Sequence, residues 1–235
     1  MTFKNRTVLC FILARGGSKG LPRKNIRIIA DKPLIAHSIL QAKGISIIDD
    51  IFISTEDFEI KKIALEFGAK VIDRPIDLAS DTSLYLDPIK HLIHKIPETK
   101  NNPIIILLQS TSPIRKIIDI LHCIENLREN IDCVVSISLV KKHPSRMFKE
   151  KNGLLEYYDE NPPKSNRQDS ETLYEMNGSI LVTTSNFLLN QEKIPMGGKM
   201  EGYLLDEISS LDIDTSFDFQ VCKFFMENKP NDHNL

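Results

Sequence analysis

VLCFILA at residues 8–14, followed at once by RGGSKGLPRKN at residues 15–25, is the stretch that decides the fold. A short apolar run that stops at a glycine-rich loop is typical of a strand buried inside an α/β protein. In open α/β sheets, ligands bind in the crevice outside the carboxyl ends of the strands. We therefore expect a buried strand at residues 8–14 and a ligand-binding loop directly after it.

Along the rest of the chain, apolar runs rich in β-branched residues alternate with segments of helical period. This alternation is the pattern of βα units around a parallel sheet. The run IIILL at residues 104–108 is apolar on both faces, which predicts a central strand. The expected fold class is α/β, with a three-layer, Rossmann-like, mostly parallel sheet flanked by helices. Expected strands lie at residues 8–14, 51–54, 71–72, 104–109, 133–139, 179–184 and near Tyr203, and expected helices at residues 34–42, 59–67, 84–96, 117–127 and 217–226.

The segment at residues 141–175 has a different composition, with His-Pro, Asn-Gly and Asn-Pro-Pro turns in polar sequence. It predicts a β-hairpin or arm that protrudes from the main domain, which residues 1–140 and 176–235 form. Such an arm exposes apolar side chains, and a patch of this kind is normally covered by a partner. We therefore expect the arm to mediate self-association through Met147, Phe148, Leu154, Leu155, Tyr157 and Tyr158.

Charge is distributed unevenly along the 235 residues. The formal net charge is only −2, which argues against a protein that coats nucleic acid or an anionic membrane. The first 43 residues hold nine basic side chains and one acidic side chain, a charge of +8, so the remainder carries −10. Six acidic side chains and no basic one lie between Lys199 and Lys223. We expect the basic and acidic regions to form the two sides of one crevice.

Nothing in the early sequence predicts export or membrane insertion. The apolar run at residues 8–14 is too short to cross a bilayer, and no small-residue cleavage site follows it as in a signal peptide. Cys10, Cys123, Cys133 and Cys222 lie in apolar sequence and lack a metal-binding spacing. They are typical of reduced core residues, so we expect a cytoplasmic protein with no membrane partner.

Three glycines and four cations lie between Arg15 and Lys24. Glycines let a backbone approach a ligand closely and turn its N–H groups toward anionic oxygens. The spacing matches neither G-x-x-x-x-G-K-[ST] nor G-x-G-x-x-G, the two common glycine motifs. The composition favours an extended loop that binds a polyphosphate. The alternative is a flexible surface turn with solvated cations.

Asp212 and Asp214 are separated by one residue near the end of the chain. In an extended segment two such side chains point the same way and can share one hard cation such as Mg²⁺. A nucleoside triphosphate on the basic loop needs such a cation, and the loop itself offers no ligand for it. The acidic pair is therefore the candidate metal site, with an ordinary acidic turn ahead of the last helix as the alternative.

Gln109, Thr111 and Ser112 follow the predicted central strand, where side chains project into the crevice. Their chemistry suits hydrogen bonding to a polyol or an acyl amide rather than acid–base catalysis. Ser112 and Pro113 can also begin the next helix, so a helix N-cap is an alternative role that does not conflict with binding.

The stretch ARGGSKGLPRKN at residues 14–25 resembles the N-terminal signature of the acylneuraminate cytidylyltransferases, also called CMP-sialic acid synthetases. These enzymes belong to the nucleotide-diphospho-sugar transferase-like superfamily. Five further stretches resemble the family's motifs in the same order along nearly the whole chain. They are ST at residues 54–55, RP with LASDT at 74–82, LLQSTSPIR at 107–115, NGSI at 177–180 and DIDT at 212–215.

The resemblance implies an enzyme that transfers a cytidylyl group from CTP to a nonulosonic acid and releases pyrophosphate. The acid sugar would be N-acetylneuraminic acid or a bacterial relative such as legionaminic or pseudaminic acid. The resemblance also implies Mg²⁺ as cofactor and a homodimer, in which the arm reaches the neighbour's sugar site. Two alternatives stay open: a nucleotidyltransferase of the same fold acting on 3-deoxy-manno-octulosonate, and a non-catalytic nucleotide-binding module.

Site residues follow from matching these motifs position by position. Four residues are expected to act in catalysis, namely Arg15, Lys19, Lys24 and Asp214. Nucleotide contacts are expected from Ala14, Arg15, Gly16, Gly17, Ser18, Asn25, Arg74, Asp81, Thr82 and Ser83. Sugar contacts are expected from Gln109, Thr111, Ser112, Arg167 and Asn177, and metal ligation from Asp212 and Asp214.

Two positions depart from the family's pattern. Ser110 stands where a proline is usual, which should alter only the rigidity of the loop. Glu175 stands where an arginine is often found just before the NGSI motif. A missing cation near the substrate carboxylate leaves the identity of the acid sugar open.

Overall fold

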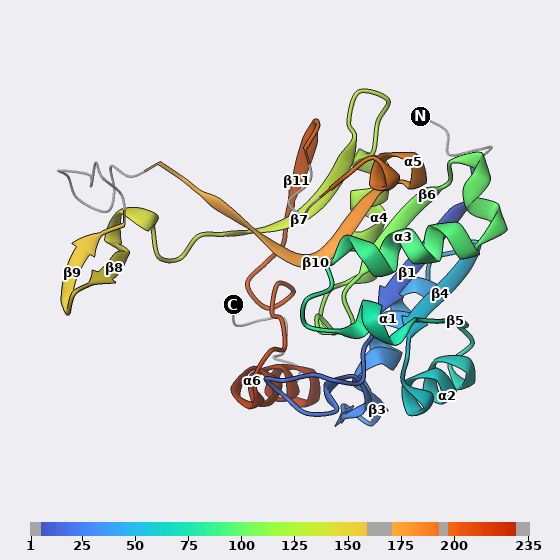
Figure 1. Cartoon of the computed structure of the whole chain (residues 1–235), viewed down its shortest axis with the longest axis horizontal. Helices are drawn as coiled ribbons and strands as arrows, with labels where there is room; N and C mark the ends of the chain where they lie inside the picture. The colour runs from blue at the N-terminus through green and yellow to red at the C-terminus, as the bar shows by residue number, and fades with distance from the viewer. Residues whose placement is uncertain (1–5, 159–170, 193–196, 229–235) are drawn as a thin grey trace.

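The structure, a computed structural model, describes residues 6–158, 171–192 and 197–228. Its centre is a seven-stranded sheet in the order β11-β7-β10-β6-β1-β4-β5 (Figure 1). Every neighbouring pair is parallel except those made by β10, which runs antiparallel to both β6 and β7. The strands are β1 (Val8–Leu13), β4 (Asp50–Thr55), β5 (Lys70–Asp73), β6 (Ile104–Leu108), β7 (Cys133–Leu139), β10 (Tyr174–Thr184) and β11 (Met200–Leu204).

Helices cover both faces of the sheet and make three layers. One face packs against α1 (Leu34–Lys43), α2 (Phe58–Glu66) and α4 (Ile117–Asn126). The opposite face packs against α3 (Leu86–Lys95) and the short α5 (Ser185–Leu189). Since β1 and β6 contribute to both clusters, they are buried on both sides, as their continuous apolar runs predict. The expected three-layer, mostly parallel α/β fold is confirmed.

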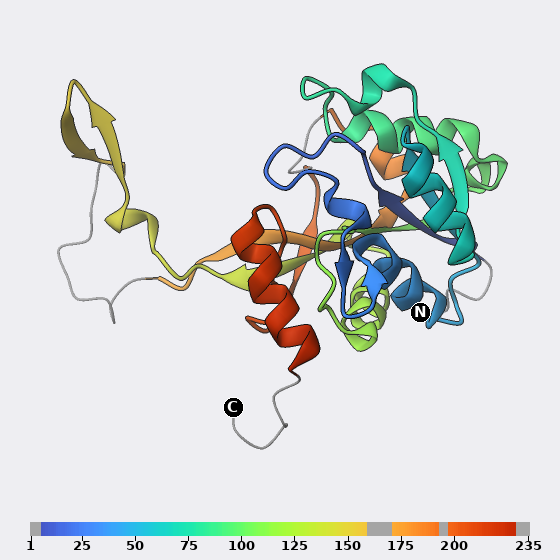
Figure 2. The same cartoon turned by 90° about the horizontal axis from the view of Figure 1, so that it is seen from below.

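A third, smaller cluster joins the region after β1 to the last helix (Figure 2). The last helix, α6 (Ser216–Glu227), contributes Phe219 and Cys222, and the loop after β1 contributes Leu21. The strands β2 (Ile28–Ile29) and β3 (Lys32–Pro33) form a small hairpin in the same region. This packing places the acidic segment before α6 beside the basic loop.

The segment assigned to the arm contains a two-stranded antiparallel hairpin, β8 (Phe148–Lys151) and β9 (Leu154–Tyr157). Asn152 and Gly153 connect the strands with φ angles of 54° and 80°. These positive values are typical of an Asn-Gly hairpin turn. Every residue of both strands is exposed, and the hairpin stands away from the main sheet (Figures 1 and 2). Strand β10 begins at Tyr174, so the end of the segment at residues 141–175 pairs with β7.

The four cysteines are free and buried, as core residues are. Burial raises the pKa of the Cys10 thiol to about 12, which keeps that thiol protonated. Among the described helices, none is both long enough and apolar enough to span a bilayer.

Leu92 in α3 and Leu65 in α2 make a matched pair for testing this core. Leu92 is fully buried against the sheet, whereas Leu65 is 53% exposed. Leu92→Ala should lower the free energy of unfolding by about 2–5 kcal/mol because it leaves a cavity. Leu65→Ala should change it by about 0.5 kcal/mol or less. Urea denaturation measures both, and equal losses would contradict the assigned packing of α3.

Candidate functional site

The loops that follow β1 and β6 meet at the carboxyl ends of the parallel strands. Two adjacent cavities lie there, with volumes of about 550 Å³ and 300 Å³. Leu13, Arg15, Tyr85 and Gln109 line both, so the cavities form one continuous crevice. This is the position in which open α/β sheets bind ligands.

The larger cavity is lined by the basic loop on one side and the acidic segment on the other. Lys24 Nζ lies 3.0 Å from Asp214 Oδ1 and also donates a hydrogen bond to the carbonyl oxygen of Ile213. Gly20 lies so close that a Cβ atom there would stand 2.4 Å from the backbone carbonyl oxygen of Asp214. Only a glycine fits this contact without displacing the acidic segment. The rest of the lining consists of Ser18, Lys19, Asn25, Ser110, Thr111, Asp212 and Thr215.

The loop after β6 holds the acidic segment in place. The hydroxyl groups of Thr111 and Ser112 both donate to Asp212 Oδ1, Ser112 at 3.2 Å. The backbone N–H of Ile213 donates to the carbonyl oxygen of Thr111 at 2.9 Å. Next in the chain, Thr215 caps α6, which anchors the segment from its other end.

Asp212 and Asp214 each keep one carboxylate oxygen, Oδ2, that has no hydrogen-bond or ion-pair partner among the described residues. Both carboxylates line the larger cavity. Across residues 6–158, 171–192 and 197–228, no three His, Cys, Asp or Glu side chains form a metal cluster. Mg²⁺ is commonly held by one or two carboxylates together with substrate phosphates and water. The pair therefore fits Mg²⁺ bound jointly with a triphosphate rather than by a cage of protein ligands.

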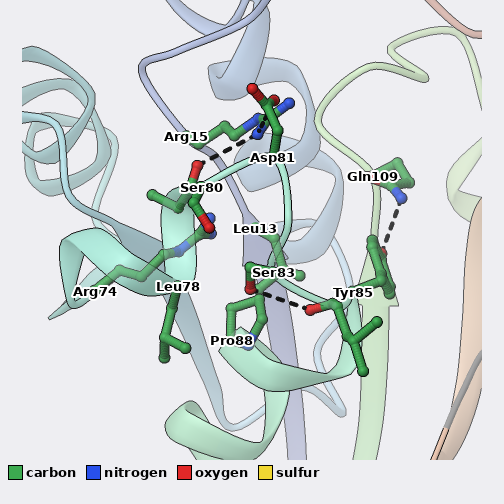
Figure 3. Close-up of a pocket in the computed structure, with 12 residues that line it drawn as sticks. Leu13, Arg15, Arg74, Leu78, Ser80, Asp81, Ser83, Tyr85, Pro88 and Gln109 are labelled. Atoms are coloured by element: carbon green, nitrogen blue, oxygen red, sulfur yellow. Dashed lines mark hydrogen bonds and ion pairs between the residues drawn. The ribbon is translucent and has the colours of Figure 1, made fainter.

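The smaller cavity lies between the first part of the basic loop and the segment before α3 (Figure 3). Arg15 Nη1 donates to Asp81 Oδ1 at 3.0 Å and to the carbonyl oxygen of Ala79 at 3.3 Å. Lys19 Nζ lies 2.7 Å from the other oxygen of Asp81. The hydrogen bond from Lys19, and secondarily that from Arg15, holds the pKa of Asp81 below its ordinary value. Two cations of the loop thus share one carboxylate, which offsets one of their two positive charges.

Arg74 forms a buried wall of the smaller cavity (Figure 3). Its Nε donates to Ser54 Oγ at 3.0 Å, and its Nη2 donates to the Ser54 carbonyl oxygen at 2.7 Å. Burial lowers the pKa of the Arg74 guanidinium, partly offset by the charge of Glu56. The ST motif at residues 54–55 therefore fixes Arg74 from the end of β4.

Asn25 and Ser110 tie the two halves of the site together. Asn25 Nδ2 donates to the Arg15 carbonyl oxygen at 2.9 Å, and Ser110 Oγ donates to Asn25 Oδ1 at 2.6 Å. Both side chains are nearly fully buried. Ser110, which stands where the related motif has proline, therefore anchors the basic loop to the end of β6 through a hydrogen bond.

The crevice brings together most residues that the sequence singled out. The larger cavity is lined by Arg15, Ser18, Lys19, Lys24, Asn25, Gln109, Thr111, Asp212 and Asp214. The smaller cavity is lined by Arg15, Arg74, Asp81, Ser83 and Gln109. Six of the expected site residues line neither cavity, namely Ala14, Gly16, Gly17, Thr82, Ser112 and Asn177. Arg167 lies outside the described residues.

Two of the residues that line neither cavity, Gly16 and Asn177, form hydrogen bonds with other parts of the fold. The Gly16 N–H donates to Glu56 Oε1 at 2.7 Å. Asn177 lies where the pairing of β10 with β7 shifts register, and its side chain bonds Ser136 and Ser138 of β7. Asn177 therefore stabilises the irregular strand that runs beside the crevice.

Tyr85 is the main residue that the sequence patterns missed. It precedes α3, lines both cavities and accepts a hydrogen bond from Gln109 Nε2 at 2.8 Å (Figure 3). Burial of the hydroxyl group, with the charge of Asp212, raises its pKa to about 12. No motif marks Tyr85, because its contact is with Gln109, which follows β6 and is distant in the sequence.

Several known proteins are similar to this chain in sequence, and others are similar to it in fold. It is 34% identical over 232 residues to the post-translational flagellin modification protein B of Campylobacter coli, covering 94% of this chain and 96% of that protein. It is 34% identical over 234 residues to the CMP-N,N'-diacetyllegionaminic acid synthase of Legionella pneumophila, with the same coverage. The N-acylneuraminate cytidylyltransferase of Escherichia coli O18:K1:H7 is 31% identical, and the chain spans 52% of its length.

Solved structures show the same architecture at lower sequence identity. A CMP:2-keto-3-deoxy-manno-octonic acid synthetase complexed with CTP superposes with a TM-score of 0.71 and 18% identity, covering 95% of this chain and all of that one. A 4-diphosphocytidyl-2C-methyl-D-erythritol synthase gives a TM-score of 0.67 and 12% identity, covering 94% and 99%. The sequence model for cytidylyltransferases matches residues 9–217, which include the basic loop, the loop after β6 and the acidic pair. The chain therefore belongs to the cytidylyltransferase family.

Proposed function

We propose that the chain transfers a cytidylyl group from CTP to a nonulosonic acid, giving the CMP-sugar and pyrophosphate. The observation that carries the proposal is the contact between the basic loop and the acidic pair, which form facing walls of one cavity. The near full-length similarity to a CMP-N,N'-diacetyllegionaminic acid synthase supports this class of acceptor. The anomeric oxygen would bond to the α-phosphorus, while the bond from that phosphorus to pyrophosphate breaks and one proton is released.

The basic loop supplies the charge for this reaction. Arg15, Lys19 and Lys24 would neutralise the triphosphate and the leaving pyrophosphate. Their carboxylate partners are accessible to solvent, since the Asp81 side chain is 49% exposed and the Asp214 side chain is 77% exposed. Phosphate oxygens can therefore replace these carboxylates. Positioning and electrostatic stabilisation supply most of the catalysis in phosphoryl transfer.

Asp212 and Asp214 would hold Mg²⁺ through their Oδ2 atoms, which have no partner within the described ranges. When bound, the metal ion neutralises charge on the phosphate oxygens. Thr111 and Ser112 orient Asp212 by donating to its other oxygen. Lys24 orients Asp214 in the same way, by donating a hydrogen bond to its Oδ1 atom.

The acid sugar would lie beyond the end of β6, where Gln109 and Thr111 line the larger cavity. We assign residues 1–140 and 176–235 to the catalytic domain, and residues 141–175 to an arm that pairs two copies of the chain. The exposure of all six apolar arm residues supports a homodimer, with Leu154 at 72% and Leu155 at 70%. Arg167 would then reach the neighbour's sugar site. We also place the protein in the cytoplasm, which its four free cysteines support.

A substrate panel tests the proposed reaction. Pyrophosphate release from CTP and Mg²⁺ should require a nonulosonic acid and should exceed release with 3-deoxy-manno-octulosonate or a sugar phosphate. Mass spectrometry should detect the CMP-sugar. Absence of turnover with N-acetylneuraminic, legionaminic and pseudaminic acids would contradict the proposal, and CTP binding without turnover would indicate a nucleotide-binding module.

Asp214→Asn should lower kcat/KM by about 100-fold or more, because it removes half of the charge that faces the metal ion. The circular dichroism spectrum should be unchanged, since Asp214 is exposed. Asp31→Asn is the matched control, because Asp31 is exposed, lies outside both cavities and has a positive φ that asparagine tolerates. An Asp214→Asn enzyme with full activity would remove Asp214 from the site.

Gly20→Ala should separate the basic loop from the acidic segment, because the added Cβ meets the Asp214 carbonyl oxygen. Misplacement of this size should lower kcat/KM by roughly 100-fold. Gly197→Ala is the control, since a Cβ atom there meets no atom of the described residues within 4 Å. Steady-state kinetics of both variants make the comparison. Equal activity of the two variants would show that the contact is not needed.

A further inference from the structure

Besides its contact with Asp214, the basic loop (residues 15–25) is held by the two acidic residues that follow β4. Glu56 Oε1 accepts the Gly16 N–H at 2.7 Å. The neighbouring Asp57 carboxylate accepts two hydrogen bonds from the Arg23 guanidinium, that from Nη2 to Oδ1 at 3.2 Å. It also lies so close to Gly16 that a Cβ atom there would collide with Asp57 Oδ2. Asp57 therefore contacts both the start and the end of the loop, a point that we call the loop neck.

Asp57 is itself fixed, because it is the N-cap of α2. Its Oδ1 accepts the backbone N–H groups of Glu59 and Ile60, both at 3.0 Å. The Asp57 side chain is mostly buried. The hydrogen bond from Arg23 is the main cause that holds the pKa of Asp57 below its ordinary value, so the carboxylate stays ionised at neutral pH. The loop neck is thus attached to the end of a packed helix.

Arg23 has a backbone conformation that needs such support. Its φ of 58° and ψ of 29° lie in the left-handed region, which is unfavourable for residues other than glycine. A conformation of this kind persists where the surrounding structure holds it. The side chain of Arg23 is held by Asp57 and by Glu59 at the start of α2. The next residue is Lys24, which pairs with Asp214, so the conformation of Arg23 decides where Lys24 points.

We propose that Arg23 and Asp57 are positioning residues, which fix the loop neck so that Lys24 reaches Asp214 and the triphosphate. Neither residue lines the two cavities, so neither is placed on a substrate. The charge of Arg23 faces the carboxylates of Asp57 and Glu59 rather than the crevice. This inference rests on the proposed binding of CTP and names residues outside the crevice on which that binding depends.

Three variants separate the ion pair from the other roles of these residues. Arg23→Ala removes the ion pair, and Arg23→Gly removes it while also relieving the unfavourable backbone conformation. Asp57→Asn removes the charge, but asparagine still caps α2. Lys61→Ala is the matched control, because Lys61 also lies in α2 and pairs with Asp73 at 2.6 Å outside both cavities.

Calorimetry with Mg²⁺ and no acid sugar measures the Kd for CTP, and steady-state kinetics give the KM for each substrate. Arg23→Ala and Asp57→Asn should each raise the Kd and KM for CTP by about tenfold, because Lys24 is no longer held in place. The KM for the acid sugar should stay within about twofold. Urea denaturation should show that both variants remain folded.

The remaining variants make the expectation specific to the ion pair. Arg23→Gly should weaken CTP binding at least as much as Arg23→Ala, because glycine lets the loop neck move. The effects of Arg23→Ala and Asp57→Asn should not add in the double variant, since the two residues act as one pair. Lys61→Ala should leave the Kd for CTP unchanged.

Three results would overturn the inference. One is an unchanged Kd for CTP in Arg23→Ala and Asp57→Asn. Another is wild-type affinity in Arg23→Gly, since the backbone conformation would then suffice without the ion pair. The third is a fall in kcat alone that follows the loss of folded protein, as a purely structural role predicts.

Measuring CTP binding without the acid sugar keeps this test separate from that of the reaction. A wild type that binds CTP but turns over no acid sugar would contradict the proposed function, and the variants would still decide the role of the ion pair. A wild type that does not bind CTP would contradict both.

Discussion

The contact between the basic loop and the acidic segment is the interaction on which the rest of the site depends. Lys24 and Asp214 are 190 residues apart in the sequence, yet their side chains form an ion pair at 3.0 Å. Gly20 allows this approach, because any larger residue would meet the backbone of Asp214. The cluster that contains Leu21, Ile213 and Phe219 packs the basic loop against the acidic segment and α6. A cavity of about 550 Å³ exists only because these segments meet.

The uneven charge of the sequence acquires a physical meaning from this arrangement. Four of the nine basic residues among the first 43 lie on the loop at residues 15–25. Arg15 and Lys19 are paired with Asp81, Lys24 with Asp214, and Arg23 with Asp57 and Glu59. The pairs that Asp81 makes with Arg15 and Lys19 are partly exposed and contribute little to stability, so their exchange for phosphate oxygens costs little. The same pairing keeps the cations close to the positions in which a triphosphate would need them. Three of the early basic residues, Arg15, Lys19 and Lys24, and two residues of the acidic stretch, Asp212 and Asp214, line the crevice, so only part of the uneven charge lies there.

Periodicity was sufficient to predict the main sheet and its flanking helices, and the resemblance to the acylneuraminate cytidylyltransferases implied most of the residues that line the crevice. The antiparallel direction of β10 was not predicted, because strand direction depends on the connection through residues 141–175 rather than on local pattern. Tyr85 was missed because its partner, Gln109, follows β6 and lies 24 residues away in the sequence. The contact of Gly20 with Asp214 also joins distant segments, and only the packing of α6 against the loop reveals it.

The account predicts that one cavity holds the triphosphate and its metal ion together. A crystal structure of the chain with CTP and Mn²⁺, with the metal located by anomalous scattering, tests this most directly. The metal ion should lie between Asp212 and Asp214, and the phosphates should contact the loop at residues 15–25. A triphosphate bound away from this loop, or a metal ion held by other side chains, would contradict the account.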